Sequence, residues 1–279
     1  MAELGIALGG GGARGFAHAG VLMELLDAGL EPGAVAGTSM GAVVGAMYAV
    51  GQDLARLARV LEHLDLYQVF GVPDSYRRVL EQAVVEALWE RIRGRPWQAE
   101  GSPRLTRMFE FLRLLCKGER FEDLPVPFVA VAADLATGEE VRIDRGPVYL
   151  GVAASAALPG VFGPVRWRGQ YLIDGGVVNN LPVDVVADFG AEVVLAVDVS
   201  APLGGVPRTL VEMALRAYDI TAQELRDVKL ARVRERLGER LVVIHPDVDE
   251  IGILDFHRLP EAVEAGREAA RAALPHIRP

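Results

Sequence analysis

One pentapeptide constrains this chain more than any other stretch: Gly37-Thr38-Ser39-Met40-Gly41. It lies between a short apolar run at residues 34–36 and a small-residue stretch at 42–50 with helical character. In a G-x-S-x-G turn the serine sits on a tight junction between a strand and a helix, and a Cβ at either glycine would clash across the turn. The pentapeptide therefore predicts an α/β fold. It also makes Ser39 the candidate nucleophile, close to the positive end of a helix dipole.

A second strand, loop and helix unit precedes this turn. Residues 5–8 are apolar and lead directly into Gly9-Gly10-Gly11-Gly12-Ala13-Arg14-Gly15, and a helical pattern follows at 16–28, with Gly29 placed as a C-cap. Two such units in tandem predict neighbouring parallel strands with both loops at the same, carboxyl, edge of the sheet. We therefore expect the glycine loop and Ser39 to face one cleft.

The glycine loop has two interpretations. Gly10, Gly12 and Gly15 match the G-x-G-x-x-G fingerprint of dinucleotide sites, but the second strand should then end in an acidic residue, and here it ends in Gly37. The alternative is that consecutive glycines present backbone N–H groups to an oxyanion, as acyl transfer requires. Arg14 is either an accessory charge beside that oxyanion or an ordinary paired or solvated arginine.

The next part of the chain, residues 53–120, is helical in pattern and predicts an insertion or cap on the sheet. We expect amphipathic helices at 53–66, 75–93 and 102–117, the first with Asp53 as N-cap. The third helix carries an apolar stripe: Leu105, Met108, Phe109, Leu112, Leu115 and Cys116. This stripe either packs onto the domain or forms a lid or interfacial surface beside its basic flank.

The remainder alternates strands and helices and predicts one domain over residues 1–279. Strands are expected at 128–133, 140–143, 165–167, 170–173, 192–199 and 241–244. Helices are expected at 148–157, 182–189, 210–237 and 259–274, the last ended by Pro275.

A catalytic serine needs a base, which is usually histidine. Three histidines lie inside helices or in the terminal tail and are expected to be structural or solvated: His18, His63 and His276. His245 ends a strand and His257 begins the last helix, so either could complete a triad with Ser39 and Asp174 in the chain order of α/β-hydrolases. Asp174 itself ends an apolar strand before two glycines, where it is either functional or a common Asp-Gly turn residue.

One acidic loop is a weak candidate for a metal site. It contains His245, Asp247, Asp249 and Glu250, but these lack EF-hand spacing, so we expect them to face solvent and predict no metal or other cofactor.

Four ordered motifs resemble a known family. They are Gly10-Gly11-Gly12-Ala13-Arg14-Gly15, Gly37-Thr38-Ser39-Met40-Gly41, Ala154-Ser155-Ala156-Ala157-Leu158-Pro159 and Asp174-Gly175-Gly176. Together with Thr137-Gly138-Glu139 and Asn180-Leu181-Pro182, they resemble the patatin-like phospholipases, particularly short bacterial members, over about residues 4–200.

The resemblance implies a three-layer patatin-like fold with a central, largely parallel sheet flanked by helices. It further implies a Ser39–Asp174 dyad that needs no histidine and an oxyanion hole at Gly10, Gly11 and Gly12. The expected function is a carboxylic ester hydrolase that cleaves phospholipid or a related lipid through an acyl-enzyme. The alternatives are a non-catalytic lipid-binding or regulatory module on the same fold and an α/β-hydrolase with a Ser-Asp-His triad.

The composition of the chain bears on its binding partners and its cellular location. A net charge of −9 argues against nucleic acid or a strongly anionic membrane as an electrostatically attracted partner. The expected partner, a lipid or ester substrate, is what the resemblance implies. Only Cys116 is present, so no intrachain disulfide can form. No signal segment or long apolar run was found, and we expect a cytoplasmic protein with peripheral contact at the inner membrane surface. Nothing in the sequence indicates an oligomeric state.

Overall fold

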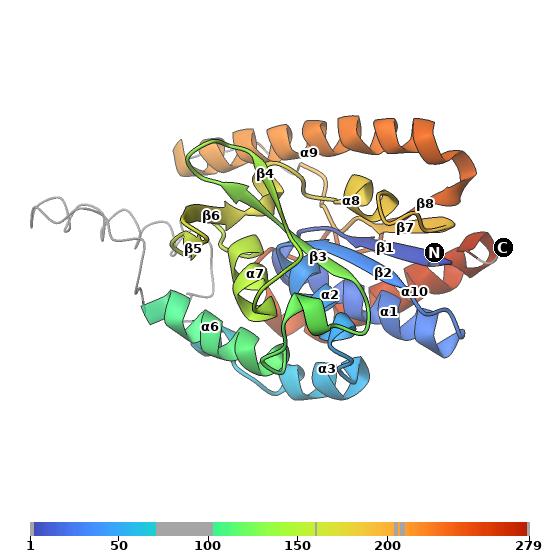
Figure 1. Cartoon of the computed structure of the whole chain (residues 1–279), viewed down its shortest axis with the longest axis horizontal. Helices are drawn as coiled ribbons and strands as arrows, with labels where there is room; N and C mark the ends of the chain where they lie inside the picture. Colours follow the sequence, from blue (N-terminus) through green and yellow to red (C-terminus); the bar gives the residue numbers. More distant parts are fainter. Residues whose placement is uncertain (1–2, 71–102, 160, 204–205, 207–209, 278–279) are drawn as a thin grey trace, which may run out of the picture.

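The centre of the molecule is a mixed β-sheet (Figure 1). The computed structural model describes residues 3–70, 103–159, 161–203, 206 and 210–277. Within these residues the sheet has eight strands: β1 (Leu4–Leu8), β2 (Ala34–Thr38), β3 (Phe128–Asp134), β4 (Glu140–Ile143), β5 (Val165–Trp167), β6 (Gln170–Asp174), β7 (Val193–Val197) and β8 (Leu241–Ile244). Their order is β5-β6-β3-β2-β1-β7-β8, with β4 also paired to β3. The strands β1, β2, β3, β7 and β8 run parallel, whereas β4, β5 and β6 pair antiparallel.

The register of the parallel strands places their carboxyl ends together. Leu8 of β1 pairs with Gly37 of β2 on one side and with Val197 of β7 on the other. On β3, Ala132 pairs with Asp174 of β6. The glycine loop and the Ser39 turn therefore leave the sheet along one edge, as the tandem units predicted, and Asp174 of the antiparallel strand β6 lies near this edge.

Helices cover both faces of the sheet. They are α1 (Ala17–Asp27), α2 (Met40–Ala49), α3 (Leu54–Glu62), α4 (Leu66–Phe70), α6 (Pro103–Leu115), α7 (Val148–Ser155), α8 (Val183–Ala187), α9 (Leu210–Leu237) and α10 (Leu259–Ile277). In β1, Ile6 and Leu8 join the core under α1, α2, α7 and α10, whereas Ala7 joins a second core under α8 and α9. Successive side chains of β1 thus point to opposite faces of the sheet. In Figure 1, α9 lies above the sheet and α1 and α10 lie below it, so the fold has the expected three layers.

The first and last long helices lie in close contact. A Cβ on Gly20 of α1 would lie 1.8 Å from the carbonyl oxygen of Val263, and one on Gly266 of α10 would lie 2.0 Å from that of Ala17. Glycine is thus required for the approach of α1 and α10. The two ends of the described chain share one core.

The prediction that Pro275 ends the last helix is wrong, because α10 continues to Ile277. A proline has no backbone N–H to donate. Because Pro275 lies near the carboxyl end of α10, the helix loses only one backbone hydrogen bond there. The buried side chain of Ile277 holds that turn against the core.

Most other boundaries agree with prediction. The strands β4, β5 and β8 and the helix α9 begin and end at the predicted residues. Gly29 has a φ of +77°, and Leu30 N–H donates to the carbonyl of Leu25 at 2.9 Å, which is the hydrogen bond of a glycine-terminated helix. The second half of the glycine loop forms a short 3-10 helix, η1 (Gly12–Phe16), which leads into α1.

The insertion is helical where the structure describes it. Asp53 caps α3 by accepting from the Arg56 N–H at 2.9 Å, as predicted, while the helix expected at 75–93 lies outside the described residues. Helix α6 is shorter than expected because Lys117 and Gly118 adopt positive φ angles and end it. Its predicted stripe is buried except for the half-buried Phe109, so it packs into the core.

Candidate active site

Ser39 occupies a strained turn between β2 and α2. Its φ and ψ are 55° and −122°, which belong to neither a strand nor a helix. A Cβ on Gly37 would lie 2.4 Å from the carbonyl oxygen of Gly41, and one on Gly41 would lie 2.1 Å from that of Leu8. Both glycines are therefore needed, and the turn has the geometry predicted from the pentapeptide.

Asp174 lies next to Ser39 although 135 residues separate them. The Ser39 hydroxyl donates to Asp174 Oδ2 at 2.6 Å, and the Gly176 N–H donates to Oδ1 at 2.8 Å. The register of β6 on β3 and of β3 on β2 creates this contact. The aspartate is thus held by a neutral hydroxyl and a backbone amide.

The environment of Asp174 favours its protonated form. The side chain is only 2% exposed, and burial raises its pKa to about 6, against the lowering effect of the hydrogen bonds from Ser39 and Gly176. At neutral pH the carboxylate is still mostly ionised. It can accept a proton, and it is a stronger base than an ordinary aspartate.

The glycine loop passes directly beside Ser39. A Cβ on Gly10 would lie 3.2 Å from the Cβ of Ser39. The Gly10 N–H donates to the carbonyl of Asn180 at 3.0 Å, so this donor is already used, contrary to the role expected for it. Within the described residues the N–H groups of Gly11 and Gly12 have no hydrogen-bond partner, and both glycines line the cavity. The oxyanion role therefore remains a prediction for Gly11 and Gly12.

Two buried side chains support these turns: Ser155, to which the sequence analysis gave no role, and His18, which it expected to be structural or solvated. Ser155 accepts from the Ser39 N–H at 3.0 Å and donates to the carbonyl of Val131 at 2.5 Å. His18 Nε2 lies 2.7 Å from the carbonyl oxygen of Gly9, and burial lowers its pKa to about 4, so the imidazole is neutral and Nε2 is the donor. The motif containing Ser155 was the available signal for it, whereas nothing near His18 in the sequence indicated its partner.

A cavity of about 300 Å³ opens over Ser39 and Asp174. One part of its wall is apolar, with Met40, Val43, Met108, Leu112, Leu158 and Phe162. Another part is polar, with Arg14, Ser200, Arg216, Asp219, Gln223 and Arg226. The predicted stripe of α6 thus supplies both core residues and part of this wall.

Arg14 lines the cavity, and its positive charge has no close anionic partner among the described residues. Its Nε donates to the carbonyl of Gly11 at 3.2 Å. Burial lowers its pKa, against the opposing effect of Asp219, Asp249 and Asp198, and no carboxylate of the described residues lies within ion-pair distance. The guanidinium is therefore placed to interact with a polar or anionic group in the cavity.

None of the five histidines lines the cavity. His245 Nδ1 lies 3.6 Å from Asp198, and His257 Nδ1 lies 3.4 Å from the hydroxyl of Tyr67. No histidine stands between Ser39 and Asp174, because these two are in direct contact. The geometry therefore favours the two-residue arrangement over the triad.

The residues that the structure describes contain no group of three or more His, Cys, Asp or Glu side chains arranged to hold a metal ion. In the same part of the chain, no helix is both long and apolar enough to cross a bilayer.

Comparison with known proteins adds a family assignment. The family model described as patatin-like phospholipase matches residues 6–187. An uncharacterized NTE family protein of Mycobacterium tuberculosis is 34% identical over 98% of this chain and 46% of its own length. Lysophospholipase NTE1 of Pyricularia oryzae is 26% identical over 95% of this chain and 18% of its own length.

Among solved structures, VipD from Legionella pneumophila is similar with a TM-score of 0.49 and 17% identity, over 98% of this chain and 66% of that one. The chain spans about half the length of the first curated relatives that it matches.

Proposed function

The chain belongs to the patatin-like phospholipase family, and on that basis we propose that it hydrolyses carboxylic ester bonds of lipids, with Ser39 as nucleophile and Asp174 as base. The observation that carries this proposal is the 2.6 Å hydrogen bond from the Ser39 hydroxyl to a buried carboxylate at the cavity. The family and the similarity to a lysophospholipase support a lipid hydrolase. We further propose that the described chain works as one acyl hydrolase domain, because β1 and β8 belong to one sheet.

The proposed cycle has two halves. Ser39 Oγ attacks the ester carbonyl carbon as its proton passes to Asp174, and the tetrahedral intermediate then expels the alcohol or lysolipid, which takes that proton. Water then loses a proton to Asp174 and attacks the acyl-enzyme, which releases the fatty acid and returns the proton to Ser39. The same carboxylate therefore serves as base and acid in both halves.

Asp174 alone is a weak base for a hydroxyl group, so the oxyanion must be stabilised as it forms. We propose the N–H groups of Gly11 and Gly12 for this purpose, since they line the cavity and have no hydrogen-bond partner among the described residues, together with the positive end of the α2 dipole. One oxyanion donor is worth about 2.7–4 kcal/mol, so two donors offset much of what an imidazole would supply.

The two parts of the cavity wall suit an amphipathic ester. The apolar part, which includes Met108 and Leu112, would hold an acyl chain, because burying methylene groups there is favourable. The polar part would hold the head group, with Arg14 as a cation that has no carboxylate of the described residues within ion-pair distance. Phospholipid or lysophospholipid is therefore the proposed substrate class, hydrolysed by peripheral contact with a lipid surface.

Replacement of the nucleophile tests the function. Ser39→Ala should abolish turnover of a short p-nitrophenyl ester and of lysophospholipid, because only the alkoxide forms the acyl-enzyme, and the variant should melt at about the wild-type temperature. A fluorophosphonate should label Ser39 in the wild type. Labelling of Ser155 or Ser200 instead, or wild-type protein without turnover on either substrate, would contradict the proposal.

A further inference from the structure

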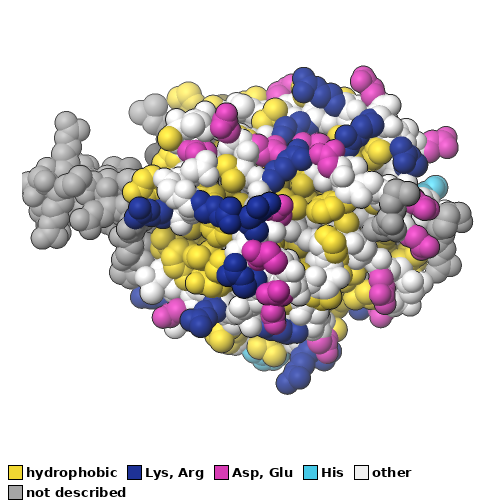
Figure 2. All heavy atoms as spheres, viewed as in Figure 1, with side chains coloured by type: hydrophobic (Ala, Val, Ile, Leu, Met, Phe, Trp, Pro, Cys, Tyr) yellow, Lys and Arg dark blue, Asp and Glu magenta, His cyan; other side chains and the backbone are white. Residues whose placement is uncertain are grey.

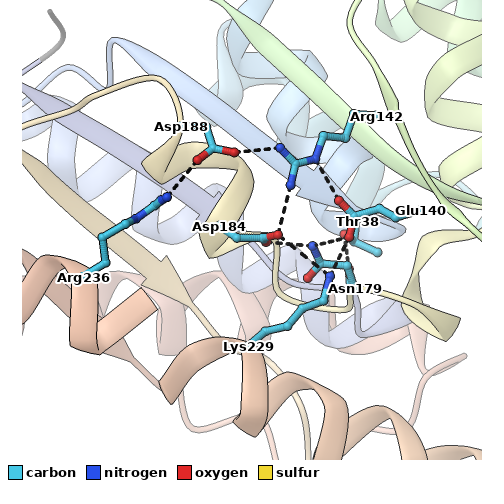
Figure 3. Close-up of polar contacts among 8 residues, drawn as sticks. All are labelled: Thr38, Glu140, Arg142, Asn179, Asp184, Asp188, Lys229 and Arg236. Carbon is cyan, nitrogen blue, oxygen red and sulfur yellow. Dashed lines mark hydrogen bonds and ion pairs between the residues drawn. The ribbon is translucent and has the colours of Figure 1, made fainter. Parts of the chain in front are cut away.

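A charge-balanced network lies on the sheet face opposite to α1 and α2, where β4, α8 and α9 meet (Figure 3). We name it the back network. It comprises three carboxylates and three cations: Glu140, Asp184, Asp188, Arg142, Lys229 and Arg236. On the face shown in Figure 2, basic and acidic side chains lie side by side in this region.

Arg142 is the centre of the back network. Its guanidinium contacts Glu140 at 2.8 Å, Asp188 at 2.8 Å and Asp184 at 3.1 Å. Lys229 of α9 lies 2.5 Å from the other oxygen of Glu140. Burial acts to raise the pKa of Glu140, but hydrogen bonds from Lys229 and Arg142 outweigh it and leave this pKa lowered.

One uncharged residue, Asn179, joins the back network. Its side-chain amide donates to Glu140 Oε2 at 3.0 Å and to Asp184 Oδ1 at 2.8 Å, and the residue is 1% exposed. Its Oδ1 is buried without a hydrogen-bond partner among the described residues. The site therefore uses the two amide donors, which an aspartate in the same place would lack.

The backbone of Asn179 contacts both turns of the active site. Its N–H donates to the carbonyl of Gly175, the residue after Asp174, at 2.8 Å. Its carbonyl accepts from the Thr38 hydroxyl, one residue before Ser39, also at 2.8 Å. A single residue thus bonds to the neighbours of both proposed catalytic residues, while its side chain is held from behind.

We propose that Asn179 is a positioning residue that uses the back network to hold Ser39 and Asp174 within hydrogen-bond distance. The network restrains the amide side chain, the side chain restrains the backbone of Asn179, and the N–H and C=O of that residue set the separation of the two turns. Charges on α9 are in this way coupled to the geometry of the dyad. The inference rests on the proposed function for its kinetic readout, and amide exchange tests it independently.

Asn179→Ala removes both side-chain donors. It should lower kcat on a soluble short-chain ester by about 10–100-fold, since small misplacements of reacting groups have effects of this size, while KM changes little. Asn179→Asp puts a third carboxylate against Glu140 and Asp184. Its kcat relative to wild type should be lowest above neutral pH and recover as the pH falls, because the protonated carboxyl regains a donor.

Two Thr→Val changes serve as a matched pair. Thr38→Val removes the hydroxyl that reaches the Asn179 carbonyl and should also lower kcat. Thr221→Val removes a hydroxyl that bonds to the Ala217 carbonyl at 2.9 Å on α9, away from the back network, and should leave kcat unchanged. If Asn179→Ala does not fold, the kcat values of Thr38→Val and Asn179→Asp test the proposal in its place.

Hydrogen exchange of peptides that cover residues 36–41 and 174–180 supplies the independent measurement. Faster exchange in both peptides, with lower kcat at unchanged KM, supports the inference. Unchanged exchange, or wild-type kcat in Asn179→Ala, overturns it. If the wild type itself has no turnover, the proposed function fails, and exchange alone decides on Asn179.

Discussion

Two carboxylates next to β3 occupy opposite electrostatic environments. Asp174 of β6 pairs in register with Ala132, and Glu140 of β4 pairs with the adjacent Ala133. Asp174 accepts only from the Ser39 hydroxyl and the Gly176 amide, and its pKa is raised to about 6. Glu140 is bound by Arg142 and Lys229, and its pKa is lowered.

The difference shows how one strand supports both stability and chemistry. A partly buried carboxylate that is paired with cations stays ionised, and removing it is costly because the cations are then left uncompensated. One that is left with neutral donors keeps its basicity, which a general base needs, and destabilises the fold when ionised. The predictions below exchange or remove these charges to test that contrast.

The largest effect is expected from Asp174→Asn. The amide keeps the shape of the site, with an oxygen that can accept from the Gly176 N–H and an NH2 that can donate to Ser39 Oγ, but it cannot take a proton, so ester turnover should fall by about 10²–10⁴-fold. Because a buried charge is removed, the free energy of unfolding at pH 8 should not decrease and should rise by at most about 3 kcal/mol. Assay and urea denaturation measure the two quantities, and loss of stability together with activity would contradict the contrast.

The pH profile should show a second, smaller effect. Since Asp174 must be ionised to act as base, kcat/KM of the wild type should fall about tenfold per pH unit below about 6. The free energy of unfolding changes with pH in the opposite direction to kcat/KM. The stabilising contribution of protonated Asp174 is present below its ordinary pKa of 3.8 and is lost as the pH rises through about 6. The stability gain of Asp174→Asn should therefore grow between about pH 4 and pH 6, be complete above pH 6 and be absent below about pH 4.

In the back network we expect a smaller effect on activity than in Asp174→Asn, because the network acts on the dyad only through Asn179, and we expect a change in stability as well. Glu140→Gln makes the same carboxylate-to-amide change as Asp174→Asn but leaves Arg142 and Lys229 undercompensated. It should lower the free energy of unfolding by about 1–3 kcal/mol at neutral pH. This loss should shrink as the pH falls through the lowered pKa of Glu140, because the wild-type charge is then lost as well.

Arg236→Gln is the control at the exposed rim of the network. Its pair with Asp188 is half exposed on both sides, so removal should change stability by less than about 1 kcal/mol. If Arg236→Gln and Glu140→Gln lowered the free energy of unfolding equally in urea denaturation, burial would not explain the expected difference between the two positions.

Local patterns predicted much of the fold because they act within a few residues. The run before Ser39, its flanking glycines and the small-residue stretch after it indicated a strand, a tight turn and a helix, and the structure has all three. The same holds for the hairpin of β5 and β6, whose turn residues Arg168 and Gly169 have positive φ angles.

Contacts between distant residues were decided by the tertiary structure alone. The sequence contained Ser39, Asp174, Ser155 and Asn179, but strand order and register bring them together, and no local pattern encodes that register between segments more than a hundred residues apart. Tertiary packing also decides that the Gly10 N–H donates to the carbonyl of Asn180 and that α10 continues beyond Pro275 to Ile277. Backbone propensity is a property of a short segment, whereas burial, the pKa of Asp174 and the partners of each donor depend on which segments meet.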